Sequence, residues 1–125
     1  MPAVVKIDPK RRLVWSAFFG DVTEQQILTH RELIAAEPHF DPAYAELVDF
    51  GDAHFTDVSE AVLKALAEAK SLYNADVPHV VIAPAELPFT LAQRYQQLAK
   101  ASRPNLFVVR SLAEAWNVLR EHGFH

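Results

Sequence analysis

The last two-thirds of the chain alternates short apolar segments with longer amphipathic ones, three times in succession. In chain order, these segments cover residues 44–50, 57–73, 79–83, 90–101, 105–110 and 112–122. The first of each pair has strand character, and the second has apolar residues at helical spacing. Such alternation is typical of βαβ units, in which helices connect parallel strands of one sheet. We therefore expect an α/β fold with a parallel sheet.

The first forty residues predict a β-hairpin and one further helix. Strand-like runs at residues 3–7 and 13–19 flank a charged turn that contains a proline. Beyond this hairpin, Thr23 and Gln26 have the spacing of a capping box, which marks a helix start. With the three strand-helix units, this predicts a single domain over residues 1–125, with about five strands and four helices.

Polar residues at capping spacing also mark the starts of the three later helices. The pairs are Asp57 with Glu60, Thr90 with Gln93, and Ser111 with Glu114. A side-chain oxygen at the first position of such a pair can accept a hydrogen bond from a free amide of the first helical turn. We therefore expect Asp57 to be the N-cap of the helix over residues 57–73.

Composition limits the classes of function. The 125 residues include 12 basic and 16 acidic side chains, a formal charge of −4, and no cysteine. The acidic excess disfavours nucleic acid as a partner, and the lack of cysteine excludes disulfides and thiol catalysis. No apolar segment approaches the ~20 residues of a membrane span, and the first residues do not have a signal-peptide pattern. We expect a cytoplasmic protein without a membrane span.

Two predicted strands suggest how the sheet is covered. Residues 79–83 and 105–110 are almost continuously apolar, as expected of strands that are covered on both faces. If helices cover only one face, the remaining apolar area, with Trp15, Phe18 and Phe19 of the hairpin, favours a partner surface. A homodimer is the simplest such partner. The same aromatic residues also fit an ordinary core.

The order of elements resembles the STAS domain of bacterial anti-sigma-factor antagonists and the related SpoIIAA-like proteins, over essentially the whole chain. Family members have an Asp-Leu-Ser segment, a short apolar run, and Asp-Ser-Ser-Gly at the start of the second helix. Here the corresponding segments are DFG at residues 49–51 and DVSE at residues 57–60, without a gap. The chain is most similar to uncharacterised stand-alone members of this superfamily.

The resemblance implies a regulatory protein whose partner is another protein, such as a regulator or kinase of the anti-sigma type. In the antagonists, a partner kinase phosphorylates the first serine of the second segment. That position is Val58 here, which has no hydroxyl group, so the usual switch cannot operate there. Ser59 follows directly and could carry the phosphate instead. A serine in the first turn of a helix is, however, commonplace without any switch.

Residues near the carboxyl ends of the predicted parallel strands are candidates for a binding or interaction site. Ligands of parallel sheets usually lie beyond these strand ends, so we expect the loops at residues 51–56, 84–89 and 110–111 to converge. The candidate residues on and beside these loops are Asp52, His54, Asp57, Ser59 and Glu86.

We predict no metal, no cofactor and no catalytic residue. Asp52, His54 and Asp57 are ligand types that zinc accepts, but their spacing matches no metal-binding signature. Ser59 has no Gly-x-Ser-x-Gly elbow around it, and the chain has no Gly-rich phosphate loop. His30 lies on an apolar stripe, where we expect a hydrogen-bonded histidine at the edge of the core.

Three functions remain open at this point. The first is a non-enzymatic STAS-like regulatory or protein-interaction module that uses the region from Asp52 to Glu60. The second is a small-molecule or lipid-binding domain, because the lipid-binding SEC14-type fold is related in topology; Leu87 and Phe89 would line its pocket. The third is an uncharacterised enzyme that uses the βα loops, with His54 as its test residue.

Overall fold

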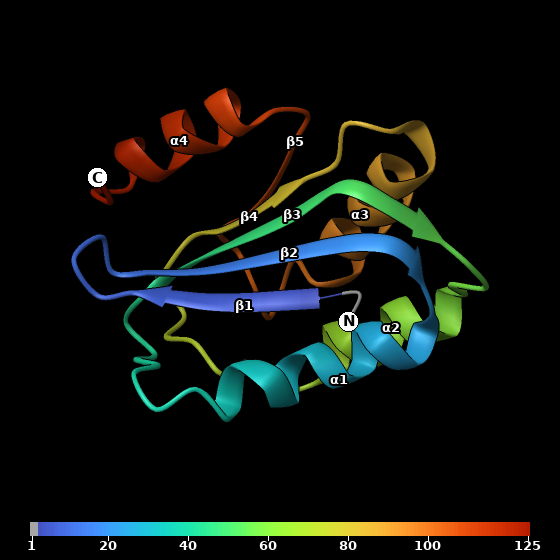
Figure 1. Cartoon of the computed structure of the whole chain (residues 1–125), viewed down its shortest axis with the longest axis horizontal. Helices are drawn as coiled ribbons and strands as arrows, with labels where there is room; N and C mark the ends of the chain where they lie inside the picture. Colours follow the sequence, from blue (N-terminus) through green and yellow to red (C-terminus); the bar gives the residue numbers. More distant parts are fainter. Residues whose placement is uncertain (1–2) are drawn as a thin grey trace.

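A computed structural model of the chain, which describes residues 3–125, forms one five-stranded mixed sheet with four helices (Figure 1). The elements are β1 (Ala3–Asp8), β2 (Leu13–Val22), α1 (Glu24–Ala35), β3 (Ala45–Phe55), α2 (Glu60–Glu68), β4 (His79–Ile82), α3 (Glu86–Leu98), β5 (Leu106–Val109) and α4 (Leu112–Glu121). The predicted α/β arrangement, a hairpin followed by three strand-helix units, is confirmed.

The strands lie in the sheet in the order of the chain, β1-β2-β3-β4-β5. β1 is antiparallel to β2, and all later neighbours are parallel. Because crossovers between parallel strands have one hand, a sheet that grows in one direction has its connecting helices on one face. α1, α2 and α3 accordingly lie on the same face, where α2 contacts both α1 and α3, whereas α4 packs on the other face over β4 and β5 (Figure 1).

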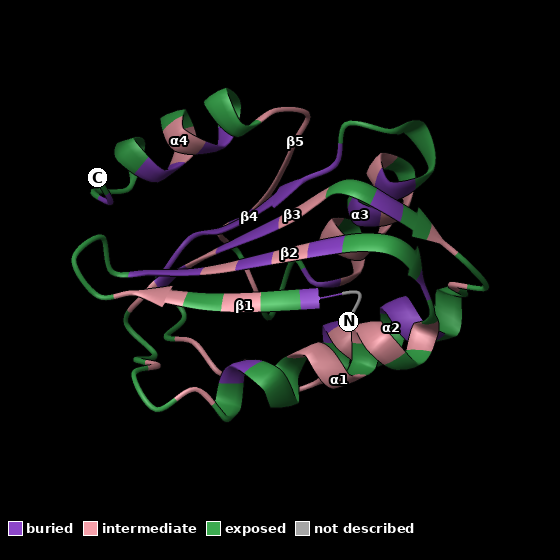
Figure 2. Ribbon diagram, in the orientation of Figure 1, coloured by how far each residue is buried: buried purple, intermediate pink, exposed green. Residues whose placement is uncertain are grey.

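Each face of the sheet has its own apolar core. Phe18, Val48 and Val81 belong to the core under α1, α2 and α3, and Leu47 and Leu119 belong to the core under α4. Buried residues concentrate on the central strands, as Figure 2 shows. No helix among residues 3–125 combines the length and the apolar character that crossing a bilayer requires.

β3 continues through the segment that was expected to be a loop. Residues 19–22 of β2 pair with residues 52–55, so the prediction of a loop at residues 51–56 is wrong. Between the pairs Ala17 with Asp49 and Phe19 with Asp52, β3 has one residue more than β2. This extra residue makes a β-bulge, and the Gly51 amide within it donates a hydrogen bond to Asp49 Oδ1 at 2.7 Å.

The bulge changes which side chains of β3 face the helices. Before it, Val48 and Phe50 pack in the core under α1, α2 and α3; after it, Ala53 and Phe55 pack in the same core. An unbroken alternation would have turned residue 52 inward instead. The polar residues that follow the bulge are therefore exposed.

Two predicted helix starts are wrong. The N-cap of α2 is Ser59, whose Oγ accepts from the Val62 amide, while Asp57 has a left-handed backbone with φ of 57°. α3 begins at Glu86, so Thr90 lies inside the helix.

The capping box at Thr23 and the cap at Ser111 are confirmed. α2 also ends at Glu68 rather than at residue 73, which leaves an irregular segment before β4.

Candidate functional site

A cavity of about 170 Å³ lies between the sheet and the three helices α1, α2 and α3. Most of its wall is apolar, and typical lining residues are Phe18, Ile27, Val48, Phe50, Leu66 and Leu91. Ala69 and Ala92 also line it, and their small side chains leave space unfilled. A cavity of ~150 Å³ in another protein accommodates benzene, so this one has room for a small ring or a short aliphatic chain.

A carboxylate, an imidazole and a phenol form one polar cluster in the cavity wall. Glu46 of β3 and His79 of β4 are direct partners in the strand register. Glu46 Oε1 accepts a hydrogen bond from His79 Nδ1 at 2.9 Å, and Oε2 accepts from the Tyr73 hydroxyl at 3.2 Å. Only 16% of the Glu46 side chain and 6% of the His79 side chain are exposed. Both carboxylate oxygens are therefore occupied by donors.

The charge of Glu46 is maintained by its neighbours. Burial opposes ionisation of Glu46, but the hydrogen bond and charge of His79, the charge of His30 and the Tyr73 hydrogen bond outweigh it, so the pKa of Glu46 is lowered. Burial raises the pKa of Tyr73, and the charge and hydrogen bond of Glu46 raise it further. At neutral pH the cluster is thus a carboxylate that accepts from a neutral phenol and from an imidazole N–H.

A second polar pair, Ser16 and His30, lies in the same layer. His30 Nε2 of α1 is 2.7 Å from Ser16 Oγ of β2, and Ser16 is fully buried. Burial lowers the pKa of His30, although the charge of Glu46 partly offsets this effect. His30 is half-buried and packs edge-on against Phe18. The prediction of a hydrogen-bonded histidine at the core edge is confirmed, and this histidine also lines the cavity.

The Ser16–His30 pair has the distance of a nucleophile and its base. Such a pair also requires a third group that orients the histidine, and a nucleophile that a substrate can reach. The two oxygens of Glu46 are instead bonded to His79 and Tyr73, and Ser16 lies within a strand without exposed area. The arrangement is therefore better suited to holding a ligand than to attacking one.

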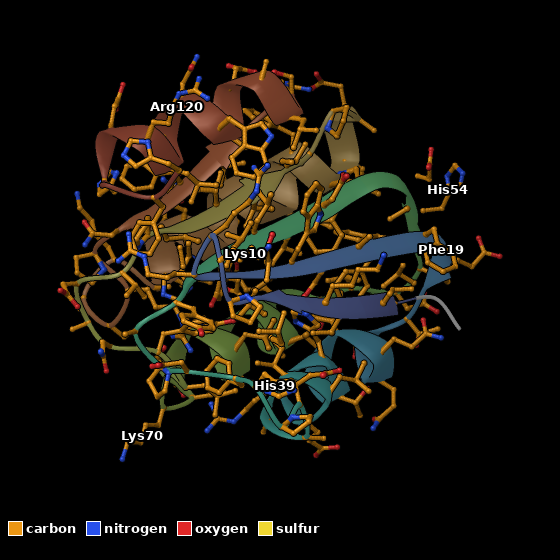
Figure 3. All side chains as sticks on the ribbon, turned by 60° about the vertical axis from the view of Figure 1, so that its left-hand side comes forward. Lys10, Phe19, His39, His54, Lys70 and Arg120 are labelled. Carbon is orange, nitrogen blue, oxygen red and sulfur yellow. The ribbon has the colours of Figure 1, made fainter. Side chains whose placement is uncertain are left out.

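The predicted site residues lie outside this cavity. Asp52 and His54 project from the extension of β3, opposite Phe19 and Asp21 of β2. Figure 3 shows Phe19 and His54 at the same outer edge of the molecule. β3 pairs with β4 only as far as Asp49, so the extension of β3 pairs with β2 alone.

The other predicted residues belong to different places on the surface. Glu86 lies in the first turn of α3 and forms an ion pair with Arg110 at 2.9 Å. Asp57 lies beside the start of α1, where it lines a shallow depression with Glu24. Among residues 3–125, no three His, Asp, Glu or Cys side chains come together in a way that could hold a metal ion.

Ser59 and Val58 have different roles at the start of α2. The Ser59 hydroxyl accepts from Val62, and its amide donates to Glu24 Oε1 at 2.9 Å. A phosphate on Ser59 would bring a second anion next to Glu24. Val58, at the position of the family phosphoserine, lines the apolar cavity. At Ser59 the Glu24 carboxylate opposes the partial positive charge of the helix start, and Val58 has no hydroxyl to carry a phosphate.

Sequence reasoning missed Ser16, Glu46, Tyr73 and His79. A signal was nevertheless present for Glu46, because it is in phase with Val48 and Phe50 along β3. A carboxylate at an inward position of a strand is rare unless it is paired. Which face of the sheet the helices cover had to be known before this signal could be used.

Comparisons with known proteins identify no relative. No family model matches the chain, and neither the curated proteins nor the solved structures include a match. Membership of the STAS superfamily therefore stays a prediction.

Proposed function

We propose that this chain binds a small, mainly apolar molecule in the cavity between the sheet and α1, α2 and α3. The observation that carries the proposal is an apolar cavity whose wall contains paired, largely buried polar groups, Glu46 with His79 and Tyr73. Apolar pockets with a few convergent polar groups are the usual form of small-molecule sites. The composition leads us to place this binding in the cytoplasm.

Stability alone does not explain the polar cluster. A buried carboxylate with its hydrogen-bond donors gains little over well-packed apolar residues of similar volume, because the charge loses its hydration. Glu46 and His79 nevertheless occupy inward positions on two adjacent central strands, next to unfilled space. Titratable groups with shifted pKa values in a cavity are typical of functional sites. A role in orienting a ligand accounts for both the space and the charge.

A benzene-sized probe tests the proposal. We expect benzyl alcohol to shift the NMR signals of Val48 and Val81, which line the cavity. Ala92→Leu, which fills the cavity from α3, should abolish the shifts, whereas Ala113→Leu on the exposed side of α4 should leave them unchanged. Absence of shifts in the unaltered protein, or equal shifts in both variants, would contradict a ligand site in the cavity.

A second proposal retains the STAS-like protein-interaction module. Its support is the exposed edge where β2 and β3 extend beyond the sheet: Phe19 is 40% exposed and lies opposite Asp52, with His54 nearby (Figure 3). An aromatic residue beside charged ones is a common feature of protein contacts. The partner is another protein or a second copy of the chain.

Native mass spectrometry of the protein purified from its own host tests this second proposal. We expect the added mass of a partner, or twice the chain mass for a homodimer. Phe19→Asp should remove that mass, whereas Leu112→Asp, at a similarly exposed position on α4, should not. A partner that both variants retain would show that the β2–β3 edge is not the contact surface.

A further inference from the structure

Two arginines line the cavity. Of the described residues that line it, Arg31 of α1 is the exposed one, and Arg103, which precedes β5, is half-buried. Arg31 Nη1 donates to the Lys70 carbonyl, and Arg103 donates to the carbonyls of Ala67 and Ala69 at 3.2 and 3.1 Å. Both guanidinium groups therefore reach the C-terminal end of α2 and the residues that follow it.

Both arginines have a structural role at this helix end. α2 has no basic residue in its last turn, and its last carbonyls carry partial negative charge. Hydrogen bonds from Arg103 offset this charge at the Ala67 and Ala69 carbonyls, and one from Arg31 reaches the Lys70 carbonyl just beyond the helix. They also fix the planar groups in place, so a ligand that binds them loses less conformational freedom in the process.

The two guanidinium groups retain donors that the protein does not use. Each guanidinium has five N–H groups, of which Arg31 uses one and Arg103 uses those of Nη1 and one on Nη2. Neither forms an ion pair with a carboxylate among residues 3–125, in contrast to Arg94 and Arg110. Positive charge without a carboxylate partner therefore lines the cavity.

The charges along the cavity have opposite signs. The positive charge of Arg103 and the negative charge of Glu46 both affect the hydroxyl of Tyr95, another lining residue. Burial raises the pKa of Tyr95 to about 12, the charge of Arg103 acts to lower it, and the charge of Glu46 acts to raise it. A ligand anion would be attracted to the arginines and repelled by the Glu46 carboxylate. These charges favour one orientation, with the anionic group at the arginines.

We propose that the ligand is a small amphiphilic carboxylate, with its apolar body in the cavity and its carboxylate hydrogen-bonded to Arg31 and Arg103. Guanidinium groups match the planar geometry of carboxylates, which favours this anion. The inference rests on the proposed ligand-binding function and adds the chemical class of the ligand. The cavity volume of about 170 Å³ limits the body to the size of a single ring.

Two probes with the same ring test the inference. Phenylacetate and 2-phenylethanol differ mainly in the charged group, and both are titrated into the protein by NMR. We expect phenylacetate to bind at least about tenfold more tightly, because charge-assisted hydrogen bonds are about twice as strong as neutral ones. Arg31→Gln and Arg103→Gln should each reduce this preference, and Arg120→Gln, on the exposed side of α4, should not.

The outcomes separate the two proposals. If 2-phenylethanol binds as tightly as phenylacetate, the carboxylate class is wrong and the cavity proposal stands. If neither probe binds, both proposals are wrong. Salt gives a readout that needs no variant: about 1 M NaCl should weaken phenylacetate binding and leave 2-phenylethanol binding unchanged. Equal salt dependence of the two probes would also overturn the inference.

Discussion

Glu46 and His79 face each other across the ladder of β3 and β4, joined by a hydrogen bond of 2.9 Å between Oε1 and Nδ1. His79 is buried and Glu46 is half-buried, both at inward positions, so each depends on the other to satisfy its polar atoms. Removing one partner would leave the second buried without compensation. This relationship sets the first prediction.

We expect Glu46→Gln to lower the free energy of unfolding by about 2 kcal/mol at pH 7, because it weakens hydrogen bonds to a charged acceptor. The pKa of Glu46 is lowered from 4.5 by folding, so its charge stabilises the protein above pH 4.5, and this contribution is lost as the pH falls further. Urea unfolding at pH 7 and at a pH below 4.5 should show that the stability difference between Glu46→Gln and the unaltered protein shrinks in acid. The exposed Glu32→Gln is the control, and a difference independent of pH would contradict the assignment.

His30 should give the unaltered protein a second pH dependence. Burial lowers the pKa of His30 below 6.5, so at acidic pH the unfolded chain binds more protons than the folded one. The free energy of unfolding is therefore highest, as far as His30 is concerned, above pH 6.5 and declines below it. The slope for one such group is at most about 1.4 kcal/mol per pH unit. Urea unfolding between pH 7.5 and pH 5 should show a weaker dependence for His30→Gln. The exposed His39→Gln should keep the full dependence; if His30→Gln keeps it too, His30 is not the group responsible.

The start of α2 gives a third prediction. Ser59→Ala should cost about 1 kcal/mol of stability, because the Val62 amide loses its acceptor. Asp57→Gly should cost nothing or stabilise the fold, because Asp57 has a left-handed backbone that glycine adopts without strain. Thermal and urea unfolding distinguish the two. The reverse order would restore Asp57 as the cap.

The bulge in β3 gives a fourth prediction. A Cβ at Gly51 would lie 3.0 Å from Asp49 Oδ1, the atom that accepts from the Gly51 amide. Gly51→Ala should therefore displace the Asp49 carboxylate and cost about 1 kcal/mol. In an Asp49→Ala background the same change should cost less, since the hydrogen bond is already absent. A double-mutant cycle without coupling would show that the carboxylate does not stabilise the bulge.

The sequence alone predicted the order and type of every element, because hydrophobic periodicity is strong in the last two-thirds of the chain. It failed at β3 for a physical reason. Gly51 followed by Asp52 and His54 has the composition of a loop, yet the glycine lies in a bulge within a strand. An isolated glycine inside a strand pattern is compatible with both interpretations until the pairing partner is known.

The candidate site was harder to predict than the fold. The residues expected to converge were polar and followed strand ends, a pattern that exposed loop residues share. Glu46 and His79 lie 33 positions apart, and only the strand register makes them neighbours. Similarly, the pairing of His30 with Ser16 depends on which face of β2 is covered by α1. Such contacts are tertiary, and no local pattern indicates them.

The order of the strands bears on how the chain is made. Each strand of the sheet pairs with the one that precedes it in the chain. As the polypeptide leaves the ribosome, every new strand therefore finds its neighbour already synthesised, and no gap in the sheet has to wait for a later segment. Such a sheet can grow from one edge during translation. At each stage, the most recently added strand is the edge to which the next strand pairs.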